Sequence, residues 1–197
     1  MESISAIEAE RKIKASGLKF VTVQEILKLF QISSANTAHK MLQRWEKYKI
    51  LTRCSQGIYF LSDANIDDFE IANHLVSPSY ISLETALNYY GILSQFPYVI
   101  TSVTTKKNKA AKHNSKDFEY AHLSPGLFWG YEKQGEALMA VPEKAIVDQL
   151  YLTSKGLRSV HVDEWDLSKI KKDKLKNFTQ RVHFAPFIKL LAELHLI

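Results

Sequence analysis

Six side chains between residues 36 and 47 could together contact DNA, and four of them, at positions 36, 40, 44 and 47, lie one helical turn apart. They carry amide, hydroxyl or cationic groups, and they are Asn36, Thr37, Lys40, Gln43, Arg44 and Lys47. Amide and guanidinium groups can hydrogen-bond to base edges in the major groove of DNA, and ammonium groups neutralise phosphates. These residue types therefore favour binding to double-stranded DNA.

The apolar residues of the same segment fall on the opposite face, at the spacing of a core-facing helix. They are Ala38, Met41, Leu42, Trp45 and Tyr48. A serine at position 33 or 34 can cap this helix, because its hydroxyl can accept a backbone N–H of the first turn. We count Ser34 among the candidate DNA-binding residues. The helix would bury one side and present its polar side to solvent.

Two helices are expected before this one. The first runs from about residue 5 to residue 15 and ends at Gly17, which can adopt the left-handed conformation that closes a helix. The second follows a capping box formed by Thr22 and Glu25. Its apolar face has helical spacing and consists of Val23, Ile26, Leu27 and Phe30. A short turn then leads into the polar helix.

A strand–turn–strand pattern follows the polar helix. Residues 50–53 and 58–61 have strand composition, and residues 54–57 between them end in Gly57, which supplies the positive φ of a tight hairpin. Arg53 and Gln56 would then point toward a sugar-phosphate backbone. Two helices joined by a short turn and followed by a hairpin are typical of a winged helix-turn-helix. We therefore predict that residues 1–62 form such a DNA-binding domain.

The positive charge of the chain is concentrated in this first part. The 197 residues carry 26 Lys or Arg and 21 Asp or Glu, of which ten basic and five acidic residues lie in positions 1–61. The remaining residues hold 16 of each sign and are neutral overall. A polyanion-binding surface is thus expected on the first domain.

Residues 66–197 are predicted to form a second, α+β domain, separated from the first by the polar segment 62–68. Helices are expected from Asp67 or Asp68 to Leu75, after Ser82, from Pro142, and in two pieces over residues 175–196. Strands are expected over residues 98–104 and 118–123, with shorter candidates at 127–131 and 136–140. A small antiparallel sheet of three or four strands is the simplest arrangement.

The densest basic run of the chain lies between the first two of these strands. It contains Lys106, Lys107, Lys109 and Lys112, followed by His113 and Lys116. Two interpretations are that this run contacts a second phosphate or that it binds an acidic partner. A solvated hairpin tip is the third, and it is the one we favour from sequence.

The sequence has no motif of a known catalytic site. It lacks the glycine-rich phosphate loop, the serine nucleophile elbow, the paired histidines of zinc proteases and the dinucleotide fingerprint. Glu143, Lys144 and Asp148 could form an acid–base cluster. A helix that begins at Pro142 and carries a Lys144–Asp148 ion pair explains them without catalysis. We expect no enzyme activity and no cofactor.

Composition places the chain among folded intracellular proteins. Hydrophobic residues make up 46% and charged residues 24% of the sequence, and no apolar run approaches the ~20 residues of a membrane span. The single cysteine, Cys54, has no second cysteine for an internal disulfide or a thiolate metal site. The seven histidines are scattered. We expect a cytoplasmic protein without a metal site or a membrane partner.

Several segments together resemble the AbiEi-type antitoxins of bacterial type IV toxin–antitoxin (abortive infection) systems, which are also described as transcriptional regulators. The resemblance covers about residues 20–152, and the residues 142–148 are its most specific part. The matching segments are Gly57-Ile58-Tyr59, Pro78-Ser79-Tyr80-Ile81-Ser82, Glu84-Thr85-Ala86-Leu87, Tyr90-Gly91, residues 101–105, Phe118-Glu119-Tyr120 and Pro142-Glu143-Lys144-Ala145-Ile146-Val147-Asp148.

The resemblance implies an N-terminal domain that represses its own operon at inverted repeats of the promoter. It also implies a C-terminal domain that counters a nucleotidyltransferase-like toxin, in which Pro142, Glu143, Lys144 and Asp148 have a structural or antitoxin role. The alternative is a winged-helix adaptor that binds protein and no DNA, for which the cations of the third helix would be dispensable. A further alternative is an RNA-binding or nucleotide-handling enzyme, which would lose activity at Glu143 or Asp148 without unfolding.

Overall fold

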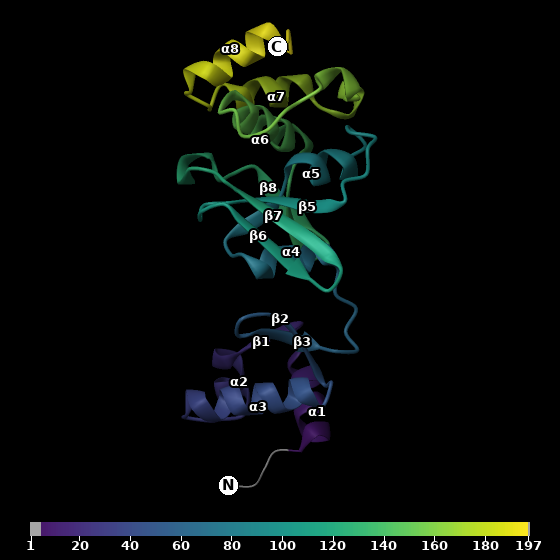
Figure 1. The fold of residues 1–197 in the computed structure, drawn as a ribbon, viewed down its shortest axis with the longest axis vertical. Coiled ribbons are helices and arrows are strands. Elements are labelled where there is room, and N and C mark those ends of the chain that lie inside the picture. Colours follow the sequence, from purple (N-terminus) through teal and green to yellow (C-terminus); the bar gives the residue numbers. More distant parts are fainter. Residues whose placement is uncertain (1–4, 197) are drawn as a thin grey trace. The chain divides into compact units, whose positions relative to one another are not determined.

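The computed structural model describes residues 5–196. The chain divides into two compact units, an N-terminal unit, Met1–Leu75, and a C-terminal unit, Val76–Ile197. Both contain helices and strands, so the fold is mixed α+β, as the sequence predicts (Figure 1).

The N-terminal unit begins with three helices, α1 (Ala6–Ser16), α2 (Val23–Leu29) and α3 (Ala35–Lys47). Their ends follow the sequence signals. Gly17 closes α1 in the left-handed conformation, with φ +69°. The capping box before α2 is formed, and the Ser34 hydroxyl caps α3.

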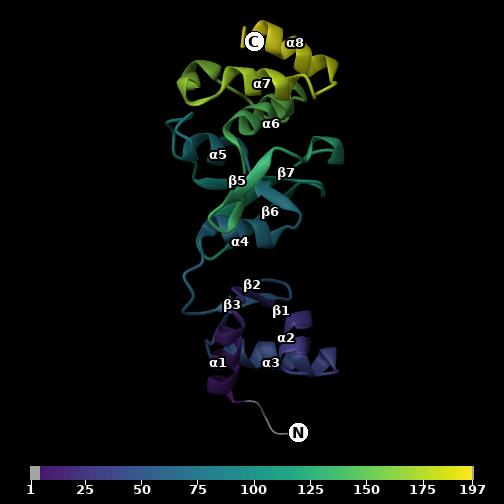
Figure 2. The same ribbon diagram turned by 180° about the vertical axis from the view of Figure 1, so that it is seen from behind.

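A three-stranded antiparallel sheet packs against these helices. It consists of β1 (Phe20–Thr22), β2 (Leu51–Ser55) and β3 (Ile58–Leu61), in the order β1-β3-β2. The predicted hairpin is confirmed, although β2 extends to Ser55 and β1 was missed. All three helices lie on the same side of the sheet in both ribbon views (Figure 1 and Figure 2).

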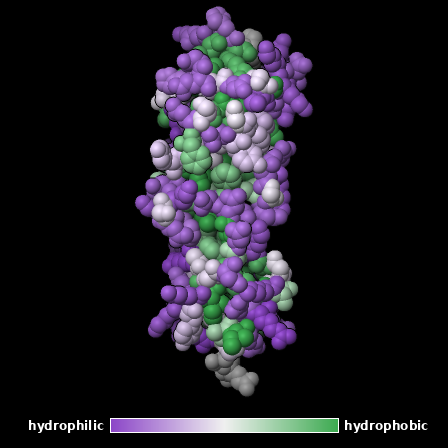
Figure 3. All heavy atoms as spheres, turned by 90° about the vertical axis from the view of Figure 1, so that its right-hand side faces the viewer, coloured by the Kyte–Doolittle hydropathy of each residue, from purple (hydrophilic) through white to green (hydrophobic). Residues whose placement is uncertain are grey.

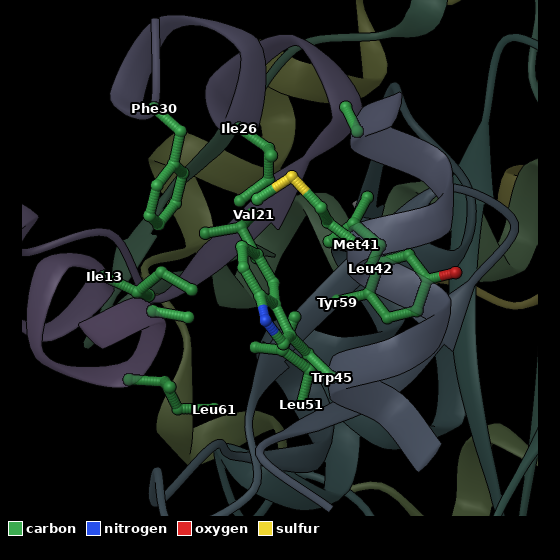
Figure 4. Packing of buried hydrophobic residues seen from close by; sticks show 12 residues of the cluster. Ile13, Val21, Ile26, Phe30, Met41, Leu42, Trp45, Leu51, Tyr59 and Leu61 are labelled. Carbon is green, nitrogen blue, oxygen red and sulfur yellow. The ribbon is translucent and has the colours of Figure 1, made fainter. Parts of the chain in front are cut away.

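The core of this unit surrounds Trp45, which is fully buried and lies in the middle of the apolar cluster in Figure 4. The ring of Phe30 on α2 lies 5.2 Å from the Trp45 ring, measured between centroids. Burying one large side chain contributes about 1.5–3 kcal/mol. Trp45 therefore fixes α3 against α2.

The boundary between the units lies after α4 (Asp68–Leu75), whereas the sequence predicts it between residues 62 and 66. Two contacts attach α4 to the N-terminal unit. Lys19 forms an ion pair with Glu70 at 3.0 Å, and the imidazole of His74 stacks on Phe20 with centroids 3.7 Å apart. The polar segment before α4 is a loop within this unit.

The C-terminal unit is built on a six-stranded mixed sheet, in the order β6-β7-β5-β4-β9-β8. Parallel pairs join β5 to β7 and β4 to β9. The predicted small antiparallel sheet is therefore wrong in size and in strand direction. The strands are β4 (Ser79–Ile81), β5 (Val99–Thr104), β6 (Lys109–His113), β7 (Lys116–His122), β8 (Tyr131–Gln134) and β9 (Ala137–Ala140).

Four helices follow or interrupt this sheet, and in both ribbon views they lie on one side of it (Figure 1 and Figure 2). They are α5 (Leu83–Tyr89), α6 (Pro142–Ser154), α7 (Lys172–Thr179) and α8 (Ala185–Glu193). Short 3-10 turns occupy Pro125–Leu127, Val162–Glu164 and Leu167–Lys169. The strand expected at residues 127–131 lies further along the chain, because β8 begins at Tyr131.

Hydrophilic side chains cover most of the face shown in Figure 3, with smaller apolar areas between them. Among the described residues, none of the helices combines the length and the apolar character that crossing a bilayer requires.

Candidate nucleic-acid interface

The outward face of α3 presents the polar residues that the sequence singled out. Asn36, Lys40, Gln43 and Lys47 are exposed, and Thr37 and Arg44 are half-buried. The opposite face, with Ala38, Met41, Leu42 and Trp45, is buried. The structure therefore brings the six predicted residues together on one accessible helix surface.

This surface is held on a fixed helix rather than on a loop. The Ser34 hydroxyl accepts the backbone N–H of Thr37 at 3.4 Å, which satisfies one of the donors at the start of α3. In the turn before it, Gln31 is left-handed, with φ +51°, and the N–H of Ile32 donates to the carbonyl of Leu27 at 2.9 Å. Because Ser34 is engaged as a cap, it contributes to the surface mainly by positioning α3.

The exposed lysines of α3 keep their charge uncompensated. Within residues 5–196, neither Lys40 nor Lys47 forms an ion pair. In contrast, Lys14 lies 2.7 Å from Glu10 and 2.6 Å from Asp63. The charges of Lys40 and Lys47 therefore make the outward face of α3 cationic.

The β2–β3 hairpin adds two exposed polar residues. Gln56 lies in its turn, and Arg53 lies on β2 just before a shift in strand register. The Nε–H of Arg53 donates to the carbonyl of Ser55 at 3.3 Å. This bond orients the guanidinium along the hairpin and leaves its Nη amino groups for an external acceptor.

The predicted second basic contact is not a single patch. The segment is not a hairpin tip between two strands, because residues 109–113 form the edge strand β6, and β5 and β7 run parallel. Lys109 and Lys112 are three residues apart on this strand and project to opposite faces of the sheet. Lys112 pairs with Asp117 at 3.5 Å, whereas Lys106 and Lys107 lie in the loop before β6.

The 142–148 motif forms a buried charge cluster. Lys144 and Asp148 form an ion pair one turn apart on α6, with side chains 1% and 2% exposed. Asp148 also accepts hydrogen bonds from Tyr80, at 3.0 Å, and from Ser82, at 2.8 Å. Burial raises the pKa of Asp148 and of Tyr80 and lowers the pKa of Lys144. The four side chains of this cluster are thus enclosed in the core of the C-terminal unit.

Glu143 fixes the same helix to α7. Its carboxylate accepts the backbone N–H of Lys171 at 2.9 Å and lies 3.2 Å from the ammonium of Lys174. Burial raises the pKa of Glu143, but the bonds from Lys171 and Lys174 outweigh it and hold the pKa below its ordinary value. Pro142 occupies the first turn of α6, as predicted.

Sequence reasoning missed three neighbours of Lys144. Trp129 places its ring centroid 4.8 Å from the Lys144 ammonium, and Arg181 lies 3.7 Å from the same centroid. Gly130 has φ +74°, and a Cβ there would lie 3.0 Å from Cγ of Lys144. None of these residues has a local signal, because each acts through a contact between distant segments. Ser82 was expected to cap a helix, but its hydroxyl donates a hydrogen bond to the carboxylate of Asp148 instead.

Within the described part of the chain, no group of three His, Cys, Asp or Glu side chains could hold a metal ion. No protein-family model matches the sequence, and a search of curated proteins gives no significant match.

Proposed function

We propose that the N-terminal unit is a winged helix-turn-helix domain that binds double-stranded DNA. In this arrangement α2 and α3 form the helix-turn-helix, α3 enters the major groove, and the β2–β3 hairpin is the wing. The helix order, the short turn and the hairpin support the assignment. The observation that carries it is the exposed face of α3, on which Lys40 and Lys47 form no ion pair with any residue from 5 to 196.

The roles follow from the side-chain chemistry. Asn36 and Gln43 can hydrogen-bond to base edges, and Arg44 can do so in bidentate fashion to guanine. Lys40 and Lys47 neutralise phosphates on either side of the groove, and Arg53 contacts the backbone beside it.

We further propose that the chain is a transcriptional repressor that acts as the antitoxin of a type IV toxin–antitoxin system. Its support is the resemblance to the AbiEi-type antitoxins. The repressor would bind inverted repeats in its own promoter, and the C-terminal unit would counter a nucleotidyltransferase-like toxin. Because Lys144 and Asp148 are buried, the motif supports the fold of this unit and does not itself contact a toxin.

The test is binding of the purified chain to its own upstream DNA, followed by fluorescence anisotropy at several salt concentrations. Affinity should fall as salt rises, because phosphate neutralisation releases counterions. Lys40→Ala should weaken binding on all sequences and reduce the slope of log K against log salt by about 1, with little change in thermal unfolding. Arg11→Ala, which removes an equally exposed cation from α1, is the matched control and should bind as the parent does.

Absence of DNA binding at low salt, or an affinity for DNA that does not depend on salt concentration, would contradict the DNA-binding proposal and favour a protein adaptor. The antitoxin role is tested separately by co-expression with a nucleotidyltransferase-like toxin. The Lys40→Ala chain should lose repression and still protect the cell, because the two roles belong to different units. Loss of protection together with repression would contradict this division.

A further inference from the structure

Two adjoining hollows lie beside the edge strand β6 in the C-terminal unit, and both are lined by Asn108. Their volumes are about 320 and 470 Å³, which lie in the range of small-molecule sites. They differ in chemistry. We name the hollow of about 470 Å³ the cationic hollow and the hollow of about 320 Å³ the apolar hollow. The two together are named the β6 groove.

The cationic hollow is lined by Thr105, Lys107, Asn108 and His122. It thus offers an ammonium group, a hydroxyl, an amide and an imidazole, and its lining includes no carboxylate. Lys107 forms no ion pair within residues 5–196. These are the groups that bind the oxygens of a phosphate.

The loop that carries these groups is fixed before any ligand arrives. The backbone N–H of His122 donates to Oδ1 of Asn108 at 2.7 Å, and Nδ1 of the same histidine lies 2.9 Å from the carbonyl of Lys106. The N–H of Lys106 donates to the hydroxyl of Thr104, which donates in turn to the carbonyl of Pro78. A site ordered in this way loses little conformational entropy on binding.

The apolar hollow is lined by the small and aliphatic side chains of Ala110, Ala121, Leu152 and Leu157, together with Asn108, Lys109, Glu119, Tyr120 and Arg158. Leu157 is 55% exposed, so part of its side chain is accessible at this hollow. At the rim, the guanidinium of Arg158 is held between Glu84, at 3.3 Å, and Glu119, at 2.9 Å. Such a fixed planar group can stack on a base, and a carboxylate can accept a base amino group.

We propose that the β6 groove binds a nucleoside phosphate, with the phosphate in the cationic hollow and the base in the apolar hollow. An acidic peptide fits less well, because a carboxylate in the apolar hollow would lie beside Glu119, which lines it. A nucleoside phosphate has one anionic end and one flat, uncharged end, which matches the order of the two hollows. The ligand is either a free nucleotide or the 5′-phosphorylated end of a strand.

The experiment is isothermal titration of the full chain with AMP, GMP, CMP and UMP, and with a trinucleotide that carries or lacks a 5′-phosphate. We expect at least one phosphorylated probe to bind, and its unphosphorylated counterpart to bind about 10-fold or more weakly, since a charge-assisted hydrogen bond contributes about 1.5–3 kcal/mol. Binding of mononucleotides identifies a free nucleotide as the ligand. Binding of the phosphorylated trinucleotide alone identifies a strand end.

Three variants locate the site. Lys107→Ala should weaken binding about 10-fold through the phosphate. Leu157→Ser should weaken the binding of the nucleotide and leave the weak binding of inorganic phosphate unchanged. Lys189→Ala, in which the lost cation is 80% exposed on α8, is the matched control and should bind as the parent does.

Failure of every phosphorylated probe to bind at about 1 mM, or binding that survives Lys107→Ala and Leu157→Ser together, overturns the proposal. Binding of a hexaglutamate peptide in place of the nucleotides would assign the groove to an acidic partner and overturn it as well. The outcome is independent of the DNA interface, because Lys40→Ala should leave nucleotide binding unchanged.

Discussion

Replacement of Asp148 by alanine should destabilise the C-terminal unit severely. The carboxylate is the acceptor for the Lys144 ammonium and for the hydroxyls of Tyr80 and Ser82, and all four side chains are buried. The variant therefore leaves an ammonium group and two hydroxyls without that acceptor in a water-free environment. Removing one partner of a buried ion pair costs about 3–5 kcal/mol, and each buried hydroxyl left unsatisfied costs about 1 kcal/mol more.

A loss of about 5 kcal/mol is comparable to the whole stability of many domains. For a unit of this size, 1 kcal/mol corresponds to about 3–5 °C in melting temperature, so the transition should fall by about 15 °C or more. The assay is thermal and urea unfolding of the full chain, followed by circular dichroism. Asp117→Ala is the control, because its ion pair with Lys112 is exposed and should contribute less than about 1 kcal/mol.

The double variant Lys144→Met with Asp148→Leu separates charge from packing. Replacing both partners by apolar side chains removes the uncompensated ammonium, so the part of the loss that comes from the unpaired charge should return, while the hydroxyls of Tyr80 and Ser82 stay without their acceptor. If Asp148→Ala unfolded within about 2 °C of the parent, or if the double variant were no more stable than the single one, the reasoning would be refuted.

Three further predictions concern single residues. Burial lowers the pKa of His74, so the unfolded chain takes up a proton at this residue before the folded chain does as pH falls below 6.5. The N-terminal unit should therefore lose stability from pH 6.5 down to the pKa of His74 in the folded chain. In that pH range, His74→Phe should make the free energy of unfolding less dependent on pH. Burial raises the pKa of Cys54 to about 11, so Ellman's reagent should react slowly with the native chain at neutral pH and rapidly in guanidinium. Gly130→Ala should destabilise the C-terminal unit by about 1–3 kcal/mol, because the new Cβ would contact Lys144 and the backbone has a positive φ. Gly91→Ala is the control, because Gly91 has a similar φ with open space around it, and this change should destabilise the unit less. Equal unfolding midpoints for the two variants would contradict the packing argument.

The helices could be predicted from sequence because their signals are local. Thr22 with Glu25 begins α2, Ser34 begins α3 and Pro142 begins α6, each within a few residues of the apolar pattern that it precedes. The outward face of α3 follows from the same periodicity, which is why its residues emerge together on the surface.

The C-terminal sheet could not be predicted in the same way. Strand β4 has three residues, too few to show alternation, and β6 is an exposed edge strand rich in lysine and alanine. The parallel pairing of β5 with β7 depends on long-range contacts that no local pattern encodes. The spacing of Lys144 and Asp148 indicates an ion pair but not its burial, because the aromatic and polar residues that enclose it come from distant segments.

The indole of Trp129, placed between an ammonium and a guanidinium group, gives the molecule a built-in optical probe. Tryptophan occurs only at positions 45, 129 and 165, so Trp45→Phe would restrict this emission to the C-terminal half. The melting curve of that half, followed by its fluorescence, could then be compared with the melting curve of the whole chain, followed by circular dichroism. Coincident curves would indicate that the two halves unfold together, and separate curves that they unfold independently.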